Sequence, residues 1–356
     1  MSGPQWRWVR RYAEQFMACA VGAGDVAVVL SETTSRPEVV DTARLALETL
    51  GASVVDVRLT TPVNPGPLPI RSTGASLAIG GNRSALAALA AADFVADCTV
   101  EGLLHAPELG AVLDGGARVL MISNEHPENV ERWPHEPALA DRVARGVALL
   151  EAASIMTVTS TAGTDLTVRL DGAFRAGSHG WCTEPGSIAH WPGGLVLAFP
   201  AAGSVEGTLV LAPGDVNLTF KQYLREPVQL TIADDHITAI DGDGLDAELF
   251  ASYLAAFDEP EAYAVSHVGW GMNEAARWES LAMWDKADLN GTELRAFAGN
   301  FLYSTGANEV AGRFCRGHFD LPMRHCTVAL DGDVVVADGQ LRDDLRATGP
   351  GPGRTT

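Results

Sequence analysis

The chain has 356 residues, of which 47% are hydrophobic and 20% charged, a composition typical of an ordinary folded protein. Its formal net charge of −20 argues against nucleic acid as a partner, because neutralising phosphates requires clustered Lys and Arg. No apolar run is long enough to cross a bilayer, and the first residues lack the apolar core of a secretory signal. The five cysteines are scattered, without a C-x-x-C pair, which suits reduced thiols better than a disulfide framework. We therefore expect a cytoplasmic protein without a membrane partner.

The first part of the chain alternates apolar runs with helical patterns. In chain order we predict a strand at 26–30, a helix at 36–50, a strand at 54–57, a Pro- and Gly-rich loop at 61–69, a helix at 82–92, strands at 94–97 and 118–122, and a helix at 136–153. This alternation predicts a Rossmann-like parallel sheet with both faces covered, and ligands that collect beyond the carboxyl ends of its strands. No G-x-G-x-x-G follows the first strand and there is no P-loop, so nucleotide binding is not indicated.

After about Ala153 short strands and turn signals dominate. We predict strands at 166–168, 195–199, 209–211 and 228–232, hairpins over 231–242 and around 331–333, and a helix at 245–257. The expected fold class is therefore α/β, with an N-terminal parallel-sheet domain at 1–153 and a β-rich α+β metal-binding domain at 154–345. The Gly- and Pro-rich tail at 346–356 is expected to be disordered.

The stretch Cys315-Arg316-Gly317-His318-Phe319-Asp320 carries the strongest chemical signal. In an extended strand, His318 and Asp320 point to the same face, so both can reach one metal ion. The best upstream candidate for a third ligand is His267. Two imidazoles and one carboxylate with open positions opposite are the ligand set of non-haem Fe(II) oxygenases.

The surroundings of these residues favour a ligand site without proving one. Gly269, Gly271 and Gly317 would allow close approach of the backbone to a ligand, and Trp270 and Phe319 could wall a flat aromatic substrate. However, the spacing is not a short-range fingerprint. Both histidines could equally be hydrogen-bonded polar residues of a core.

Three further clusters could contribute to a site. His105 follows a predicted strand at the expected ligand edge and could act as an acid or base, or simply cap the helix after it. The loop 181–194 is dense in His, Trp, Pro and Gly, and it could line a site or form a rigid turn. Arg295 could bind an oxyanion and Ser304 a substrate oxygen, although either could be structural.

Taken together, these stretches resemble the 2,5-dihydroxypyridine 5,6-dioxygenase family, which opens the ring in nicotinate breakdown. The likeness covers about 25–339 and is carried by motifs in a fixed order: L-L-H-x-P-E at 103–108, E-P-G-x-x-x-H-W-P-x-G at 184–194, E-G-T-L-V-L at 206–211, S-H-V-G-W-G at 266–271, R-A-F-x-G-N-F-L-Y-S-T-G at 295–306, and H-x-D at 318–320.

The resemblance implies an extradiol-type ring opening by Fe(II) and O2, which converts 2,5-dihydroxypyridine to N-formylmaleamate, in a homo-oligomer. The residues that it implies are the metal ligands His267, His318 and Asp320; the catalytic residues His105, His190 and Ser304; and the substrate contacts Leu104, Ser178, Glu184, Arg295 and Ser304.

Alternatives follow from the same resemblance. The family has an acidic pocket residue just before the position of Gly180, where this chain reads Ser178-His179, so another hydroxylated ring could be the substrate. The family is also similar to aminopeptidase T type metallopeptidases, whose two-metal ligands fall on Leu195, His267 and Leu302 here. Two of those ligands are apolar in this chain, which disfavours a dinuclear hydrolytic centre. A metal-free binding protein is the non-enzymatic alternative.

Overall fold

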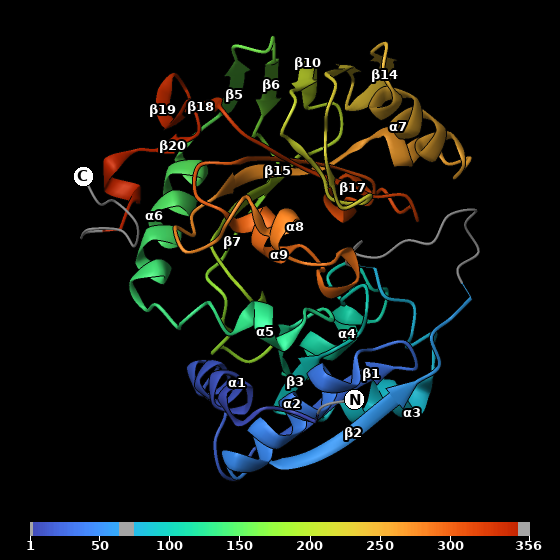
Figure 1. Ribbon diagram of the computed structural model, residues 1–356, viewed down its shortest axis with the longest axis vertical. Helices are drawn as coiled ribbons and strands as arrows, with labels where there is room; N and C mark the ends of the chain where they lie inside the picture. Colours follow the sequence, from blue (N-terminus) through green and yellow to red (C-terminus); the bar gives the residue numbers. More distant parts are fainter. Residues whose placement is uncertain (1–2, 64–74, 348–356) are drawn as a thin grey trace.

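The computed structural model describes residues 3–63 and 75–347, and it confirms the α/β fold class. The predicted loop at 61–69 lies partly outside the described residues, as does most of the predicted tail at 346–356. Figure 1 shows the N-terminal sheet and its helices at one end of the molecule, and the β-rich part stacked on them.

The N-terminal part is built on a five-stranded parallel sheet with strand order β2-β1-β3-β4-β8. Its strands are β1 (Val26–Glu32), β2 (Ser53–Leu59), β3 (Phe94–Asp97), β4 (Arg118–Met121) and β8 (Ile188–His190). The helices of this part are α1 (Trp6–Ala18), α2 (Pro37–Thr49), α3 (Arg83–Ala90), α4 (Leu109–Asp114) and α5 (Pro127–Val130). The next helix, α6 (Ala138–Ala152), packs instead on β7 (Phe174–Ser178) and β9 (Leu195–Phe199) of the β-rich part.

Helices cover both faces of this sheet, as the strand–helix alternation predicts. On one face, Phe16 of α1 and Leu47 of α2 pack on Phe94. On the other, Leu89 of α3 and Val112 of α4 pack on the remaining side chains of the same strands. Burial on both faces explains why the central strands β1, β3 and β4 are mostly apolar, whereas the edge strand β2 is partly exposed.

The strand β8 connects the two parts of the chain. It lies downstream of 153, yet it pairs in parallel with β4, so that His190 stands beside Met121 at the carboxyl edge of the sheet. The chain thus returns to the parallel sheet after it has begun the β-rich part.

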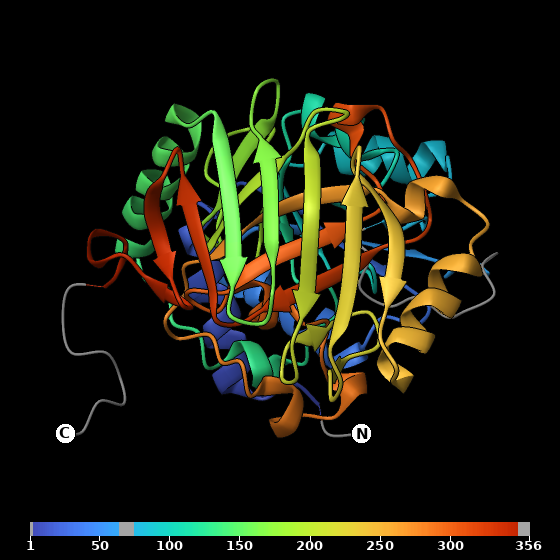
Figure 2. The ribbon, with the colours of Figure 1, turned by 90° about the horizontal axis from the view of Figure 1, so that it is seen from above.

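The β-rich part consists of two antiparallel sheets and a small hairpin. The larger sheet has the order β14-β13-β10-β6-β5-β18-β19-β20, and Figure 2 shows it face on. Its strands are β5 (Ile155–Ser160), β6 (Asp165–Arg169), β10 (Val205–Leu211), β13 (Val228–Ala233), β14 (His236–Asp241), β18 (Cys326–Leu330), β19 (Asp333–Ala337) and β20 (Gln340–Leu341).

The second sheet, with the order β17-β16-β15-β9-β7, crosses beneath the first. Its strands are β7 (Phe174–Ser178), β9 (Leu195–Phe199), β15 (Val265–Gly271), β16 (Phe301–Thr305) and β17 (Phe319–Met323). The remaining elements are the hairpin β11 (Val216–Asn217) and β12 (Gln222–Tyr223), the helices α7 (Leu245–Ala255), α8 (Ser280–Met283) and α9 (Thr292–Ala296), and the 3-10 turns η1 (Pro260–Tyr263), η2 (Lys286–Asp288), η3 (Glu309–Ala311) and η4 (Asp343–Leu345).

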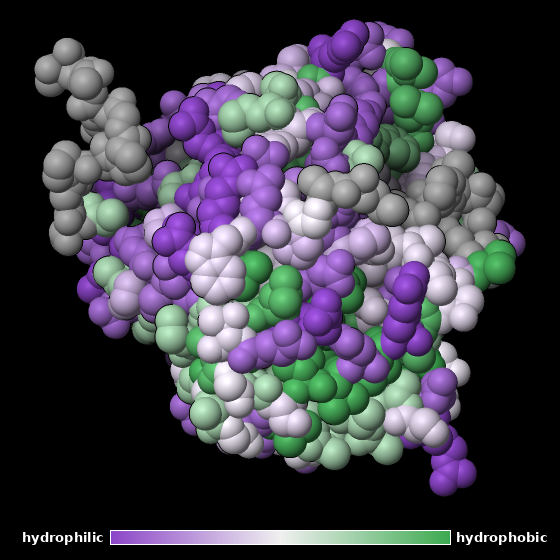
Figure 3. All heavy atoms as spheres, turned by 60° about the horizontal axis from the view of Figure 1, so that its bottom comes forward, coloured by the Kyte–Doolittle hydropathy of each residue, from purple (hydrophilic) through white to green (hydrophobic). Residues whose placement is uncertain are grey.

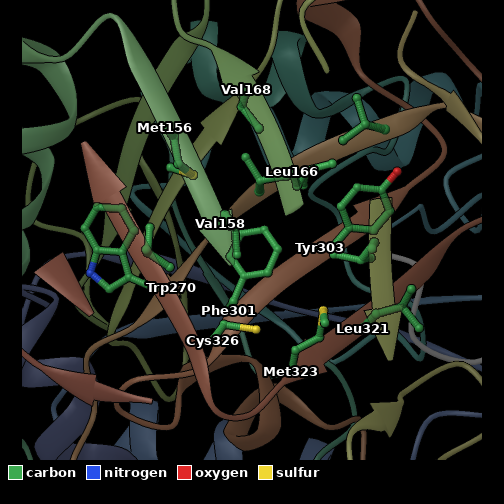
Figure 4. Close-up of a cluster of buried hydrophobic side chains, with 14 of the residues drawn as sticks. Met156, Val158, Leu166, Val168, Trp270, Phe301, Tyr303, Leu321, Met323 and Cys326 are labelled. Carbon is green, nitrogen blue, oxygen red and sulfur yellow. The ribbon is translucent and has the colours of Figure 1, made fainter. Parts of the chain in front are cut away.

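The largest apolar core fills the space between these two sheets. Figure 4 shows side chains from β5 and β6 meeting those of β15, β16 and β17, with Trp270, Phe301 and Tyr303 among the largest. All three are fully buried. Because this core fixes β15, β16 and β17 in place, the other face of their sheet can hold polar side chains in defined positions.

The surface over the N-terminal end mixes apolar and polar side chains (Figure 3). Trp6 and Met17 of α1 and Val55 of the edge strand β2 are among the exposed large apolar residues. Over 3–63 and 75–347, no helix combines the length and apolarity that crossing a bilayer requires.

Candidate metal centre and active site

A small buried cavity of about 40 Å³ lies between the carboxyl edge of the parallel sheet and the second antiparallel sheet. From the parallel sheet it receives Leu104 and His105 after β3, Ser123 after β4, and His190 at the end of β8. This is the edge at which an open α/β sheet binds its ligands. The opposite wall comes from β15, β17 and the α9 helix.

Three neighbouring strands carry the polar centre of this cavity. His267 lies where the pairing of β15 with β16 shifts register, and such a bulge can redirect a side chain. Ser304 of β16 stands directly opposite Asp320 of β17. His318 immediately precedes β17, so it reaches the same side as Asp320.

The three predicted metal ligands converge at this point. His318 Nε2 lies 3.3 Å from Asp320 Oδ1, and His267 Nε2 lies 3.6 Å from the same oxygen. Metal–ligand bonds of roughly 2.1 Å at right angles put neighbouring donor atoms roughly 3 Å apart. The observed separations of 3.3 Å and 3.6 Å are somewhat longer than this value, and small side-chain movements would let the donor set share a single ion.

Two further side chains, Ser304 and Arg295, form hydrogen bonds with the donor groups. Ser304 Oγ donates to Asp320 Oδ1 and lies 3.0 Å from His267 Nε2, while Arg295 Nε donates to Asp320 Oδ2 at 2.5 Å. In keeping with these contacts, the described part of the chain contains no three His, Cys, Asp or Glu side chains already arranged as a metal cage. A metal ion would have to replace the hydrogen bonds of Ser304 with bonds of its own.

Burial and charge give each of these groups a defined protonation state. Burial alone would raise the pKa of the Asp320 carboxyl, but Arg295 and then His318 hold it well below its usual range. Burial lowers the pKa of His267 to about 3, and burial followed by the charge of Arg295 lowers the pKa of His190 to about 4. At neutral pH the centre therefore presents a carboxylate and a neutral His267, the forms that bind metals.

His105 faces the two histidine ligands across the cavity. Its ring centroid lies 5.8 Å from that of His318 and 6.4 Å from that of His267. Its Nδ1 lies 3.1 Å from Glu309 Oε1, and its Nε2 is buried without a hydrogen-bond partner among the described residues. Hydrogen bonding to His105 contributes to lowering the pKa of Glu309, against the effect of its burial. A buried, unpaired ring nitrogen facing the metal ligands suits proton exchange with a bound molecule.

The structure brings most, but not all, of the other predicted site residues to the cavity. Leu104, His190 and Arg295 line it. Ser178 does not: its hydroxyl accepts a hydrogen bond from the His190 backbone at 3.3 Å, at the end of β7. Glu184 is exposed in the turn before β8 and contacts Thr183, so this geometry does not support direct contact with a substrate.

Two expectations about the surroundings of the ligands are wrong. Trp270 and Phe319 are fully buried in the core between the sheets, because alternate residues of a strand point to opposite faces, and they do not wall the cavity. The glycines serve packing rather than ligand approach: a Cβ on Gly269 would lie 2.0 Å from Val196 O. Likewise, a Cβ on Gly317 would lie 2.7 Å from Ala262 Cβ.

The remaining wall of the cavity is apolar. Met121, Leu195, Leu197 and Leu302 line it. Leu195 and Leu302 stand at the positions where the peptidase resemblance would require metal ligands, and neither side chain can bind a metal. The cavity thus combines one cluster of polar donors with a hydrophobic face, as small-molecule sites usually do.

The chain is similar over most of its length to proteins of one known family. The family model for 2,5-dihydroxypyridine 5,6-dioxygenase matches residues 7–343. The chain belongs to this family. A curated relative from Pseudomonas putida KT2440, named 2,5-dihydroxypyridine 5,6-dioxygenase, is 38% identical over 317 residues, which cover 88% of this chain and 89% of the relative.

Solved structures extend the comparison to the fold. The structure of the 2,5-dihydroxypyridine dioxygenase from P. putida KT2440 superposes with a TM-score of 0.90 at 35% identity, and covers 96% of this chain and all of that one. Wild-type AmpT from Thermus thermophilus superposes with a TM-score of 0.61 at 13% identity, covering 94% of this chain and 99% of that one, which shows a shared fold alone. Membership of the dioxygenase family makes the protein an enzyme and is consistent with a metal cofactor.

Two residues of this dioxygenase-family site were missed by the sequence analysis. Glu309 bonds to His105 from a turn 204 residues downstream. Asn290 accepts a hydrogen bond from Arg295 Nη1 at 3.3 Å and donates one to Val100 O at 3.1 Å. Neither position is marked by spacing or periodicity, since both contacts depend on how the two parts of the chain meet.

Proposed function

We propose that this protein is an Fe(II)-dependent ring-opening dioxygenase, with 2,5-dihydroxypyridine and O2 as substrates and N-formylmaleamate as product. The observation that carries the proposal is the convergence of His267, His318 and Asp320 on one point, opposite His105, in a chain of the 2,5-dihydroxypyridine 5,6-dioxygenase family. The name and titles of the P. putida relatives support the ring substrate.

The chemistry of the donor set supports iron. Two imidazoles and a carboxylate on one side of an ion form the facial set of Fe(II) oxygenases. What Fe(II) supplies there when bound is a set of open positions for a chelating ring and for O2, with a positive charge that favours deprotonated oxygens. Arg295 holds Asp320 Oδ2 and so leaves Oδ1 directed at the two histidines.

His105 is the proton-transfer residue in this proposal. Its buried Nε2 takes the proton from the ring hydroxyl as the ring binds, and later returns one to the opening ring. Glu309 fixes the orientation of the imidazole through Nδ1, as a carboxylate partner does for many catalytic and metal-binding histidines.

Arg295 and His190 orient the ring and stabilise negative charge, because both line the cavity, where the guanidinium and the neutral imidazole can donate to a substrate oxygen. Ser304, which was expected to contact the substrate, does not line the cavity: it is fully buried and bonds to Asp320 and His267, so in this proposal it positions those two side chains. The cavity is about 40 Å³, and one water needs roughly 10–15 Å³ by this measure, so a bound ring also uses space beyond His105. A space of this size has room for only a few waters. When the ring displaces them, ring and O2 meet in a low-dielectric site.

The competing reading is an aminopeptidase T type metallopeptidase. The similarity to AmpT reaches the fold, but the two leucines of the apolar wall, Leu195 and Leu302, leave a second metal without ligands. A different hydroxylated ring is a closer alternative, since Ser178 and His179 replace the family's acidic residue.

The decisive experiment is anaerobic reconstitution with Fe(II), followed by O2-uptake assays with 2,5-dihydroxypyridine, other hydroxylated pyridines and catechols. Stoichiometric iron with equimolar O2 uptake and an N-formylmaleamate product supports the proposal. O2 uptake with another ring alone would change the substrate but keep the chemistry. Zinc-dependent peptide hydrolysis would instead support the peptidase, and a protein that binds no metal would be a binding module.

We further propose two domains with a boundary near 153, across which β8 returns to the sheet of the first domain, and a homo-oligomeric assembly. The exposed apolar side chains of Trp6 (61% exposed) and Val55 (41% exposed) at the N-terminal end support an assembly surface there. Light scattering after size exclusion tests the assembly, and a monomeric mass at micromolar concentration would contradict it.

A further inference from the structure

The only two lysines of the 356-residue sequence, Lys221 and Lys286, line the same cavity. This cavity, of about 400 Å³, lies at the junction of the two parts of the chain, between the β11–β12 turn, the η2 turn and the loop after β4. Its described lining also includes Thr34, Asn124 and Thr219, and no acidic side chain. In a chain of net charge −20, a wall with two ammonium groups and no described carboxylate is a local reversal of sign.

Backbone carbonyls hold both ammonium groups at this wall. Lys221 Nζ donates to Leu289 O and, at 3.1 Å, to Lys286 O; Lys286 Nζ donates to Phe220 O at 3.1 Å. A carbonyl accepts a hydrogen bond but brings no net charge, so these contacts hold the two ammonium groups at the wall of the cavity. Of the two acids next to Lys286, Asp288 is paired with Arg36 at 2.9 Å, and Asp285, which begins the same turn, is exposed and does not line the cavity.

The lysine-lined cavity shares a wall with the metal centre. Ser123 and Asn290 line both this cavity and the inner cavity that holds His267, His318 and Asp320. The Asn290 amide accepts a hydrogen bond from Arg295, the cation of the inner cavity. Asn290 thus stands between one cationic group, Arg295, and the two lysines of the neighbouring cavity.

The second neighbour of the inner cavity has the opposite charge. A cavity of about 370 Å³ shares Glu101 and His105 with the inner one, and Glu32, Glu259 and Glu309 also line it. Arg316 is its one basic lining residue among those described, and it is paired with Glu259 at 2.6 Å. A neutral molecule can approach through such a mouth, while an anion is repelled by it.

We propose that the lysine-lined cavity is an anion port that binds the carboxylate of the ring-opened product as it leaves the metal centre. This inference rests on the proposed function. There, O2 accepts four electrons from a neutral ring, both oxygen atoms enter the product, and the bond between the hydroxyl-bearing carbon and its neighbour breaks. The new carboxyl group releases one proton, so the product is an anion at neutral pH although the substrate is not. The port thus separates product from substrate by charge.

Two matched probes test the port without turnover. Maleamate carries a carboxylate like that of the product. Maleamide, in which an amide replaces this carboxylate, is its neutral counterpart. Binding of each to the anaerobic iron-loaded enzyme is measured by calorimetry for wild type, Lys286→Met, Lys221→Met and Lys286→Arg. Arg10→Met, at an exposed position on α1, is the control for loss of one positive charge elsewhere.

We expect Lys286→Met and Lys221→Met each to weaken maleamate binding about five- to tenfold, since each removes one charge-assisted contact. Maleamide binding stays unchanged, and Lys286→Arg and Arg10→Met bind maleamate like wild type. Lys286 is exposed, so its variant keeps the test valid if the Lys221 variant fails to fold.

The outcomes separate this inference from the proposed function. If the lysine variants bind maleamate as tightly as wild type does, or if their affinity for maleamide falls in parallel, the anion-port proposal is wrong, even for an enzyme that opens the ring. If no hydroxylated ring is turned over but maleamate binding depends on the two lysines, the anion site is supported and the proposed reaction fails.

Discussion

Arg295 and Asp320 form an ion pair in which the guanidinium Nε lies 2.5 Å from one carboxylate oxygen, Oδ2. The other oxygen, Oδ1, faces both histidine ligands. One carboxylate oxygen, Oδ2, therefore makes a structural contact with Arg295, and the other, Oδ1, is left for the proposed metal ion. Arg295 was expected to contact substrate, and it does line the cavity, but its closest partner is Asp320, a proposed metal ligand.

This arrangement predicts that Arg295→Lys weakens metal binding as well as turnover. A lysine keeps the charge but loses the fixed fork of the guanidinium, so the Asp320 carboxylate can rotate. Loss of such a supporting contact costs roughly 10- to 100-fold in metal affinity. Titration of Fe(II) under anaerobic conditions measures the change. The matched control is Arg313→Lys, which alters another buried Arg–Asp pair, with Asp235 at 2.8 Å. Equal loss of affinity in both variants would mean a general effect on folding.

Removal of a ligand should abolish metal binding altogether. In His318→Ala and Asp320→Ala the ion loses one of its three protein donors, and the proteins should hold no stoichiometric iron after desalting and show no O2 uptake. Elemental analysis of the reconstituted proteins is the measurement. His325→Ala, an exposed histidine whose ring pairs with Asp338, is the control and should retain iron. An iron-replete, active His318→Ala protein would refute the ligand assignment.

Substitution of Glu309 should lower kcat without lowering the iron content. Glu309→Gln replaces the carboxylate that holds His105 Nδ1, so the imidazole loses its fixed orientation, and we expect kcat to fall about tenfold. Iron content should stay at the wild-type level. In His105→Ala, by contrast, the proton-transfer group itself is gone, and kcat should fall by roughly 10²–10⁴.

Glu259→Gln controls for the Glu309 prediction. Glu259 lines the same cavity of about 370 Å³ as Glu309, but it pairs with Arg316 rather than with His105. If both variants lose the same factor in kcat, the effect comes from the charge of the cavity and not from the orientation of His105.

Much of the fold could be predicted because its elements carry strong local signals. The strand Phe94–Asp97 has the predicted bounds, and the helix Pro37–Thr49 lies within one residue of them, since a buried apolar run and a glycine stop are encoded locally. The helix Trp6–Ala18 was not predicted. Its signal was present nonetheless, because Trp8, Tyr12 and Phe16 recur every four residues on one buried face.

Contacts between distant segments could not be predicted in this way. The three-residue strand Ile188–His190 lies in a stretch rich in Pro and Gly, and only its pairing with β4 shows that it belongs to the parallel sheet. The proposed metal ligands His318 and Asp320 could be singled out because H-x-D is a local pattern with a family resemblance behind it. The interaction of Glu309 with His105, and the wall of Asn290 beside Arg295, arise only when the two parts of the chain meet.

Asp97, at the carboxyl end of β3, should make the folded protein less stable as the pH rises. Burial raises the pKa of this carboxyl to about 7, against its hydrogen bonds with Thr99, whereas in an unfolded chain the value is about 3.9. Between these values the folded state holds a proton that the unfolded state has released, so the free energy of unfolding falls from about pH 4 to pH 7. The effect is on the order of a few kcal/mol.

Asp97→Asn should remove this contribution. Its amide oxygen can still accept from Thr99, and its amide group takes the place of Oδ2, which has no partner among the described residues. Asp215 and Glu293 have pKa values raised to about 6 and act in the same direction, so the relevant quantity is the difference between wild type and variant. Urea unfolding at pH 5 and pH 8 measures it, with exposed Asp141→Asn as the control. We expect the variant to gain stability over wild type at pH 8 but much less at pH 5. A constant difference at both pH values would show that Asp97 stays ionised in the folded protein.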